Sequence, residues 1–91
     1  MRARVYVTLK PSVFDPQGRV VADALVTLGY QDVQDVRQGM FFEVEVDTTA
    51  AGYANLSAEA QRAKVEARVT EMADKLLANP VIESYRVEVL P

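Results

Sequence analysis

The chain contains no cysteine and no histidine among its 91 residues. These two absences exclude disulfide bonds, thiolate nucleophiles, imidazole bases and nearly every transition-metal site. Only carboxylates, lysine, tyrosine and serine remain as reactive side chains. We therefore expect no catalytic residue, no metal-binding residue and no cofactor bound by this chain.

Long apolar runs and an excess of positive charge are also missing. No apolar stretch approaches the roughly 18 residues that span a bilayer, and residues 1–5 alternate where a secretory signal would have an apolar block. Ten Lys and Arg stand against thirteen Asp and Glu, which gives a net charge of −3 and the wrong sign for a phosphate-binding surface. We expect a cytoplasmic protein that binds neither membranes nor nucleic acid.

The first third of the chain has the pattern of a strand followed by a helix. Polar and apolar side chains alternate over residues 2–10, which predicts a half-buried strand. Asp15 is a favourable N-cap, and Pro16 suits the first helical position. A helix is therefore expected from Pro16 to Leu28, where Gly29 ends it.

Residues 31–47 are strand-like, but their apolar spacing changes. Val33 and Val36 are three residues apart, whereas the apolar residues from Phe42 to Val46 alternate strictly. This change of phase near Gly39 predicts either two strands or one strand broken by a bulge.

The remaining chain is expected to hold a loop, a helix and a last strand. Residues 48–56 lack a period and suit an exposed loop. Ser57 is a favourable cap for a long helix that Asn79 and Pro80 end, and alternation returns in residues 81–90.

The order of these elements predicts a single α+β domain over residues 1–91. It matches the ferredoxin-like β-α-β-β-α-β plan, a two-layer sandwich in which both helices cover one face of an antiparallel sheet. The other face would stay open and carry Tyr6, Thr8 and Phe41, which makes it a candidate protein contact, although single exposed aromatics are also ordinary. A domain this small gains burial by association, so we expect a homodimer or homotetramer.

The sequence does not match the motifs of several known functional classes. Residues 38–42 resemble part of the acylphosphatase signature, but Glu43 stands where that family has a phosphate-binding arginine. RNA-binding aromatics in a basic surface and a phosphate-binding glycine loop are absent. Glu43, Glu45 and Asp47 could suggest a divalent-cation site, but a solvated strand face explains them better, because such sites draw ligands from a loop around the ion.

Three runs of sequence carry a family resemblance. They are Val7-Thr8-Leu9-Lys10-Pro11 continued by Val13-Phe14-Asp15-Pro16-Gln17-Gly18, then Leu28-Gly29-Tyr30, and then Asp35-Val36-Arg37-Gln38-Gly39. These runs resemble the V-x-L-K-x-x-V-x-D-P-Q-G, L-G-Y and D-V-R-x-G segments of PurS, the small-subunit family of phosphoribosylformylglycinamidine (FGAM) synthase. The similarity is dense over residues 3–46, and residues 79–83 complete it. The chain departs from the family at Met40, where lysine is common, and in the loop 47–56, which looks longer than usual.

The resemblance implies a function in purine biosynthesis. In this family the small subunit joins a large synthetase subunit (PurL) to a glutaminase subunit (PurQ). The complex converts formylglycinamide ribonucleotide to formylglycinamidine ribonucleotide with ammonia released from glutamine. ATP and Mg²⁺ are expected on the large subunit, and this chain would be a non-catalytic part of the ligase.

The resemblance also suggests which residues contact the partner subunits. The candidates are polar or backbone-special residues beside strand ends: Lys10, Asp15, Gln17, Arg37 and Gly39. A turn and a helix cap would equally explain Asp15 and Pro16, but not Gln17. Two other classes of function remain as alternatives, a dimeric ferredoxin-like sensor of a small molecule and a self-contained enzyme that uses carboxylates.

Overall fold

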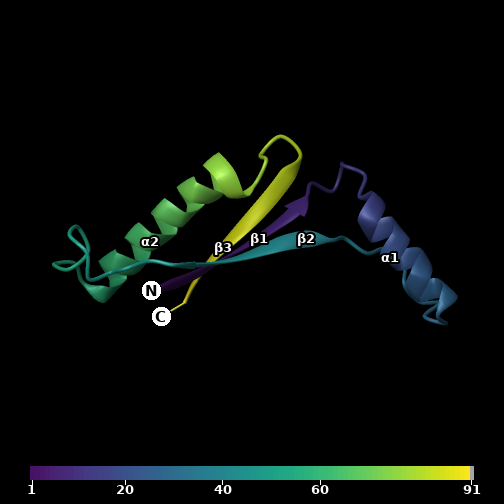
Figure 1. Cartoon of the computed structure of the whole chain (residues 1–91), viewed down its shortest axis with the longest axis horizontal. Helices are drawn as coiled ribbons and strands as arrows, with labels where there is room; N and C mark the ends of the chain where they lie inside the picture. Colours follow the sequence, from purple (N-terminus) through teal and green to yellow (C-terminus); the bar gives the residue numbers. More distant parts are fainter. Residues whose placement is uncertain (91) are drawn as a thin grey trace.

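The computed structural model describes residues 1–90 of the chain. Three strands form one antiparallel sheet in the order β2-β1-β3, and two helices connect or flank them (Figure 1). The elements are β1 (Arg2–Leu9), α1 (Pro16–Thr27), β2 (Gly39–Glu45), α2 (Ala58–Met72), a π-helical turn (Ala73–Leu77) that extends α2, and β3 (Glu83–Leu90). This architecture confirms the α+β, ferredoxin-like class.

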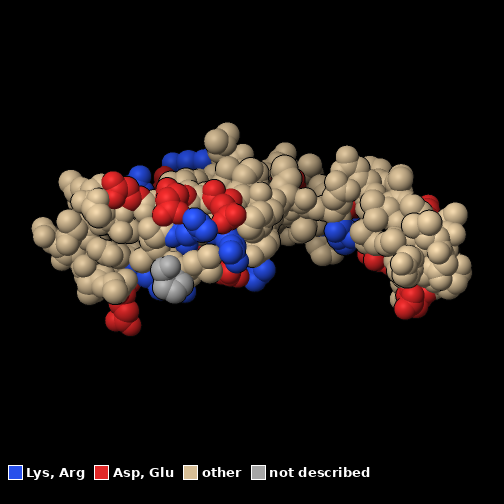
Figure 2. Space-filling view, turned by 60° about the horizontal axis from the view of Figure 1, so that its bottom comes forward, with Lys and Arg blue, Asp and Glu red and all other residues tan. Residues whose placement is uncertain are grey.

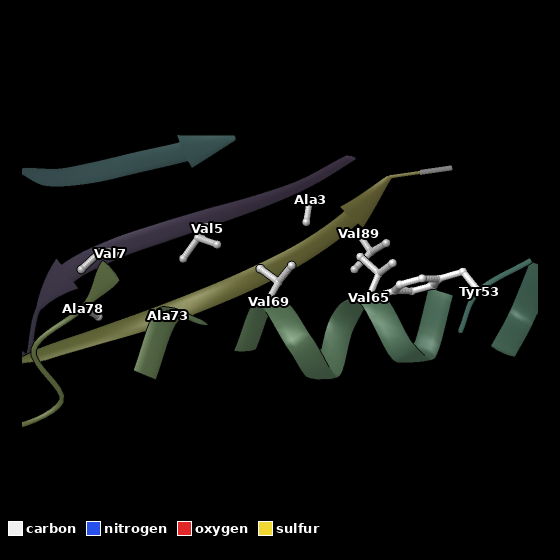
Figure 3. Packing of buried hydrophobic residues seen from close by; sticks show 9 residues of the cluster. All are labelled: Ala3, Val5, Val7, Tyr53, Val65, Val69, Ala73, Ala78 and Val89. Carbon is white, nitrogen blue, oxygen red and sulfur yellow. The ribbon is translucent and has the colours of Figure 1, made fainter. Parts of the chain in front are cut away.

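The hydrophobic core lies between the sheet and α2. Alternation in β1 turns Ala3, Val5 and Val7 toward the helix, and Val65 and Val69 meet them from α2. Figure 3 shows these side chains between the two layers. Full burial of each valine contributes about 1.5–3 kcal/mol, so this small cluster is the main apolar support of the fold.

The structure has one strand fewer than the expected plan. Residues 31–38 form no strand, and only β2 lies between the two helices. Val33 and Val36 are half-buried in the segment that returns along α1. At the start of this segment, Tyr30 N donates to Leu25 O at 3.0 Å. The spacing of three residues between Val33 and Val36 fits a segment packed against a helix rather than a sheet, which explains the change of phase near Gly39.

The position of α1 also differs from the expectation. Both helices were expected on one face of the sheet, but α1 lies beyond the end of the sheet (Figure 1). The chain is accordingly elongated, with extents of 56 × 27 × 15 Å. We call residues 11–38, which are α1 and the segment that returns from it, the arm. An amphipathic pattern predicts that a helix has an apolar face, but it does not predict which surface covers that face. The position of α1 could therefore not be predicted from its sequence.

The loop before α2 is more closely packed than its sequence indicates. Tyr53 is only 5% exposed and belongs to the core. Gln61 Nε2 donates to Tyr53 O at 2.8 Å, and Lys64 Nζ lies 4.4 Å above the Tyr53 ring. The loop 48–56 is therefore anchored to α2 at its centre. No helix within residues 1–90 has the length and apolar content needed to cross a membrane.

Candidate functional site

All five candidate residues meet at the junction of the arm and the sheet. We call this junction, formed by residues 9–18 and 36–39, the joint. A cavity of about 240 Å³ opens there, and Asp15, Gln17 and Gly39 line it. Arg37 precedes Gln38, another residue that lines the cavity, and its side chain donates a hydrogen bond to the carbonyl oxygen of Lys10. The structure thus brings together residues that the sequence separates by more than twenty positions.

Asp15 connects the two chain segments of the joint. Its Oδ1 accepts a hydrogen bond from Gly18 N at 2.9 Å, the expected N-cap of α1. Its Oδ2 accepts one from Gln38 N at 2.8 Å, just before β2. The backbone N–H of Gly18, then that of Gln38, and the positive charge of Arg37 lower the pKa of this carboxyl. Asp15 is therefore an ionised structural clamp with both oxygens engaged.

Arg37 holds the chain that leaves β1. Its Nη2 lies 3.3 Å from Leu9 O, 2.8 Å from Lys10 O and 3.0 Å from Val13 O. One guanidinium nitrogen thus faces three carbonyl oxygens at the end of β1 and in the turn that leads to α1, and it donates to backbone groups of this turn. Arg37 thus fixes this turn within the chain, and its contact with a partner subunit stays a prediction.

Two glycines allow the segments of the joint to approach closely. A Cβ on Gly18 would collide with Val36 O and with the Asp15 carboxylate. A Cβ on Gly39 would collide with Val7 O and the Thr8 side chain. Glycine is therefore required by contact at both positions, which gives a structural reason for the D-P-Q-G and D-V-R-x-G runs.

Lys10 and Gln17 differ from the other three candidates. Lys10 enters the hydrogen bonds of the joint through its backbone: Lys10 N donates to Ile82 O at 2.9 Å, and Lys10 O accepts from Arg37. Gln17 is exposed on the first turn of α1 and borders the cavity. Within residues 1–90, the side chains of Lys10 and Gln17 take no hydrogen bond or ion pair, in contrast to those of Asp15 and Arg37.

Sequence reasoning missed two participants in this joint. Gln38 N is the second donor to Asp15, and Val36 O sets the space at Gly18. Backbone groups occur in every residue, so the residue types of Val36 and Gln38 do not indicate these contacts. The one clue in the sequence is that polar residues and glycine occur both where the arm begins and where it ends.

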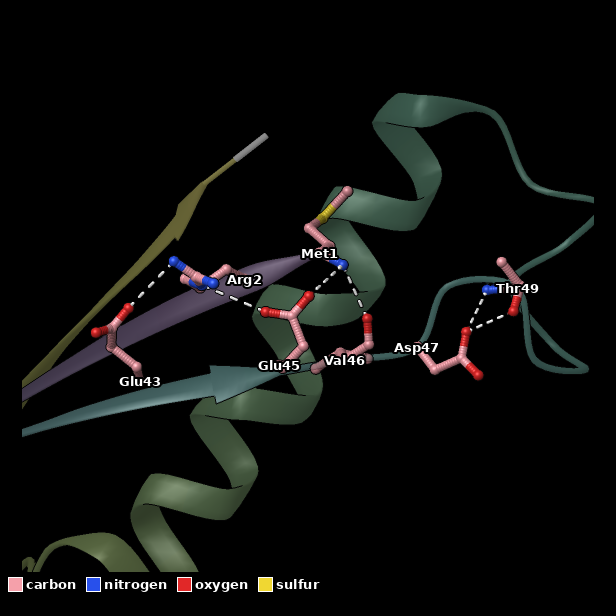
Figure 4. Close-up of polar contacts among 7 residues, drawn as sticks. All are labelled: Met1, Arg2, Glu43, Glu45, Val46, Asp47 and Thr49. Carbon is pink, nitrogen blue, oxygen red and sulfur yellow. Dashed lines mark hydrogen bonds and ion pairs between the residues drawn. The ribbon is translucent and has the colours of Figure 1, made fainter.

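The sheet face opposite α2, which we call the open face, carries a row of charges and an aromatic pair. Arg2 Nε lies 3.3 Å from Glu45, and Arg2 Nη1 lies 3.6 Å from Glu43 (Figure 4). Tyr6 and Phe41 pair across β1 and β2 with ring centroids 5.2 Å apart, as expected for residues left on the open side. Arg86 lies over the other side of the Tyr6 ring at 4.4 Å.

The acidic residues of β2 do not form a cation site. Glu43 and Glu45 pair with Arg2, while Asp47 accepts hydrogen bonds from Thr49 N and Oγ1 (Figure 4). No cluster of acidic residues within the described chain is arranged to hold a metal ion. Glu43 and Glu45 therefore stabilise a solvated strand face, and Asp47 stabilises the turn that follows β2.

Comparison with known proteins shows the family to which the chain belongs. The PurS family profile, described as Phosphoribosylformylglycinamidine (FGAM) synthase, matches residues 2–91. A Bacillus subtilis protein, phosphoribosylformylglycinamidine synthase subunit PurS, is 44% identical over 88 residues, which are 97% of this chain and 90% of the relative.

Solved structures give the same result. The structure of B. subtilis PurS aligns with a TM-score of 0.73 and 41% identity over 99% of this chain and 98% of that one. A Methanocaldococcus jannaschii PurS, described as one of the subunits of formylglycinamide ribonucleotide amidotransferase in the purine biosynthetic pathway, aligns with a TM-score of 0.73 and 33% identity over 96% and 92%. The chain belongs to the PurS family of FGAM synthase small subunits, which act in purine biosynthesis.

Proposed function

We propose that this chain joins the large synthetase subunit (PurL) to the glutaminase subunit (PurQ), so that ammonia from glutamine reaches formylglycinamide ribonucleotide. The observation that carries the proposal is the match to the PurS family across residues 2–91. The chain contributes no catalytic group in this proposal; ATP and Mg²⁺ act on the large subunit. Residues 1–91 form one domain, and the complex works in the cytoplasm.

A joining subunit accelerates the overall reaction without reactive side chains. Ammonia released into water at neutral pH becomes mostly ammonium and diffuses away. Holding the two active sites together raises the local supply of ammonia and limits its loss to solvent. The proposed gain is therefore in the coupling of two reactions, and each reaction keeps its own active site.

The structure suggests which surfaces serve the assembly. Asp15, Arg37 and Gly39 act indirectly, because they fix the arm relative to the sheet. Gln17 lines the cavity of the joint, and Lys10 follows Leu9, which also lines it. The open face adds Tyr6 and Phe41, and Phe41 is 51% exposed. We propose that these two surfaces contact the partner subunits, and that the chain itself is a homodimer or homotetramer.

Co-purification tests this function. The tagged chain is mixed with the large subunit and the glutaminase of the same organism, and the retained proteins are identified by mass. Retention of both subunits with this chain, and of neither with a tag alone, is the expected result. Capture of neither subunit would contradict the joining function. The match to the PurS family favours this function over the small-molecule sensor and over a self-contained enzyme.

A further inference from the structure

Helix α2 carries a groove on a side other than the one that packs against the sheet. The groove has a volume of about 400 Å³ and is lined by Lys64, Arg68, Glu71, Met72 and Lys75. Its four charged residues follow one another at intervals of four, three and four positions, so they share one side of the helix. The core valines of α2, Val65 and Val69, point elsewhere. We call this feature the basic groove.

The basic groove is positive, although the protein as a whole is acidic. Three cationic side chains stand against the single carboxylate of Glu71, whereas the chain has a net charge of −3. Two of the three lysines of the chain line this groove. On the face that Figure 2 shows, by contrast, positive and negative side chains are interspersed over the sheet. A local excess of positive charge attracts negatively charged groups.

The central side chain of the basic groove is the one that the chain itself does not use. Lys64 Nζ donates to Gly52 O at 2.7 Å, and Lys75 Nζ lies 2.6 Å from Glu71 Oε1. Between these two lysines, the exposed Arg68 guanidinium makes no hydrogen bond or ion pair within residues 1–90. Its N–H donors therefore remain available for an anionic group.

The shape of the basic groove favours an acidic segment of a protein over a phosphate ion. Its positive charges extend from Lys64 to Lys75, about 16 Å along the helix, rather than converging on one point. A segment that carries several Asp or Glu side chains can contact this whole length, and its carboxylates can pair with the fork of Arg68. Met72, half-buried in the lining, adds apolar contact, and both arginine and methionine are enriched in protein interfaces.

We propose that the basic groove binds an acidic segment of one of the two partner subunits, with Arg68 at the centre of the contact. A chain that joins two subunits needs separate surfaces for them. Helix α2 covers the sheet face opposite Tyr6 and Phe41, so the groove and the open face can be occupied at the same time. This inference rests on the proposed function and adds a contact surface to it.

Reversal of one charge tests the contact. Arg68→Glu should raise the dissociation constant of the complex with both partner subunits by about tenfold or more, because repulsion replaces an ion pair. Arg62→Glu makes the same change on an exposed part of α2 outside the groove and should change this constant less than about twofold. The effect of Arg68→Glu should shrink between about 50 and 500 mM NaCl, because salt screens exposed charges. Analytical ultracentrifugation measures binding, and circular dichroism checks folding. Equal constants for the two variants would overturn the proposal.

Cross-linking identifies what occupies the groove. An Arg68→Lys chain keeps the charge and gains an amine at the centre of the groove, which a water-soluble carbodiimide joins to any carboxylate in contact. After assembly with both subunits, mass spectrometry should find this amine joined to Asp or Glu of a partner subunit. An Arg62→Lys chain is the control and should give no such product. If the complex forms but the amine joins only this chain or a second copy, the groove proposal is wrong and the joining function stands. If the unmodified chain forms no complex, both are wrong.

Discussion

The Asp15 carboxylate accepts a hydrogen bond from the backbone N–H of Gln38, 23 residues further along the chain, at 2.8 Å. Its other oxygen caps α1 through Gly18 N. One side chain therefore sets both the start of the arm and its return to the sheet. Because the proposed assembly depends on where the arm points, this contact connects a local helix cap to the quaternary structure.

The joint should give Asp15 a measurable effect on pH stability. Its pKa is lowered in the fold by the Gly18 and Gln38 N–H groups, so the ionised form is favoured in the folded state. This stabilisation is complete above the ordinary pKa of 3.8 and is lost as pH falls through the lower folded-state pKa. Asp15→Asn should therefore reduce Tm most near pH 7, with a difference that shrinks below about pH 4.

Thermal melts from pH 2.5 to pH 7 check this prediction. Asp35→Asn changes the net charge by the same amount on the exposed returning segment and serves as the control. An Asp15→Asn penalty that stays constant across this range would show that the charge of the carboxylate contributes nothing to the joint.

Gly18→Ala should destabilise the protein although it lies in a helix. At an exposed helical position this replacement commonly stabilises by about 0.5–1 kcal/mol, because glycine is the more flexible residue. Here the new methyl group would collide with Val36 O, so a loss of about 1–3 kcal/mol is expected. Urea denaturation measures the change. A stabilised Gly18→Ala chain would mean that Val36 is not packed against the helix.

Replacing Arg37 should weaken the fold as well as the assembly. The guanidinium faces three carbonyl oxygens of residues 9–13, and Arg37→Glu removes this donor. Losing these bonds at an exposed site should cost about 1–2 kcal/mol. Faster amide hydrogen exchange in residues 10–15 is the readout. Unchanged exchange in Arg37→Glu would leave Arg37 as an ordinary surface residue.

Phe41→Arg should weaken binding of the partner subunits by about tenfold or more, because the open face would lose the aromatic pair with Tyr6. Leu76→Arg places the same charge on an exposed apolar residue of the π-helical turn, outside both the joint and the open face, and is the control. Gel filtration with both partner subunits compares the two variants. Equal binding by the two variants would remove the open face from the proposed assembly surface.

Local elements of this fold could be predicted from the sequence because their causes are local. Asp15 and Ser57 cap the helices as expected, and the alternation in β1 predicted its buried face. The family resemblance was also found from short runs, and the match over residues 2–91 confirms it. These signals depend on neighbours within four residues along the chain.

Long-range placement could not be predicted in the same way. The pattern of α1 predicts an apolar side, but it does not say that Gly18 packs against Val36 or that the helix lies beyond the end of the sheet (Figure 1). Arg37 carries no sign that its partners are the carbonyls of residues 9–13. Tyr53 enters the core only because its loop folds back on α2. Each depends on a contact between distant segments.

The source of nitrogen tests the joining function most directly. Reconstituted large subunit and glutaminase are assayed for formylglycinamidine ribonucleotide synthesis, with and without this chain, using either glutamine or high ammonium chloride. Without the chain, glutamine-dependent synthesis should be lost and ammonium-dependent synthesis should be retained, because coupling is lost while the ATP-dependent chemistry remains. Adding the chain back should restore glutamine use until it saturates. Full glutamine-dependent synthesis in its absence, or loss of ammonium-dependent synthesis as well, would contradict this account.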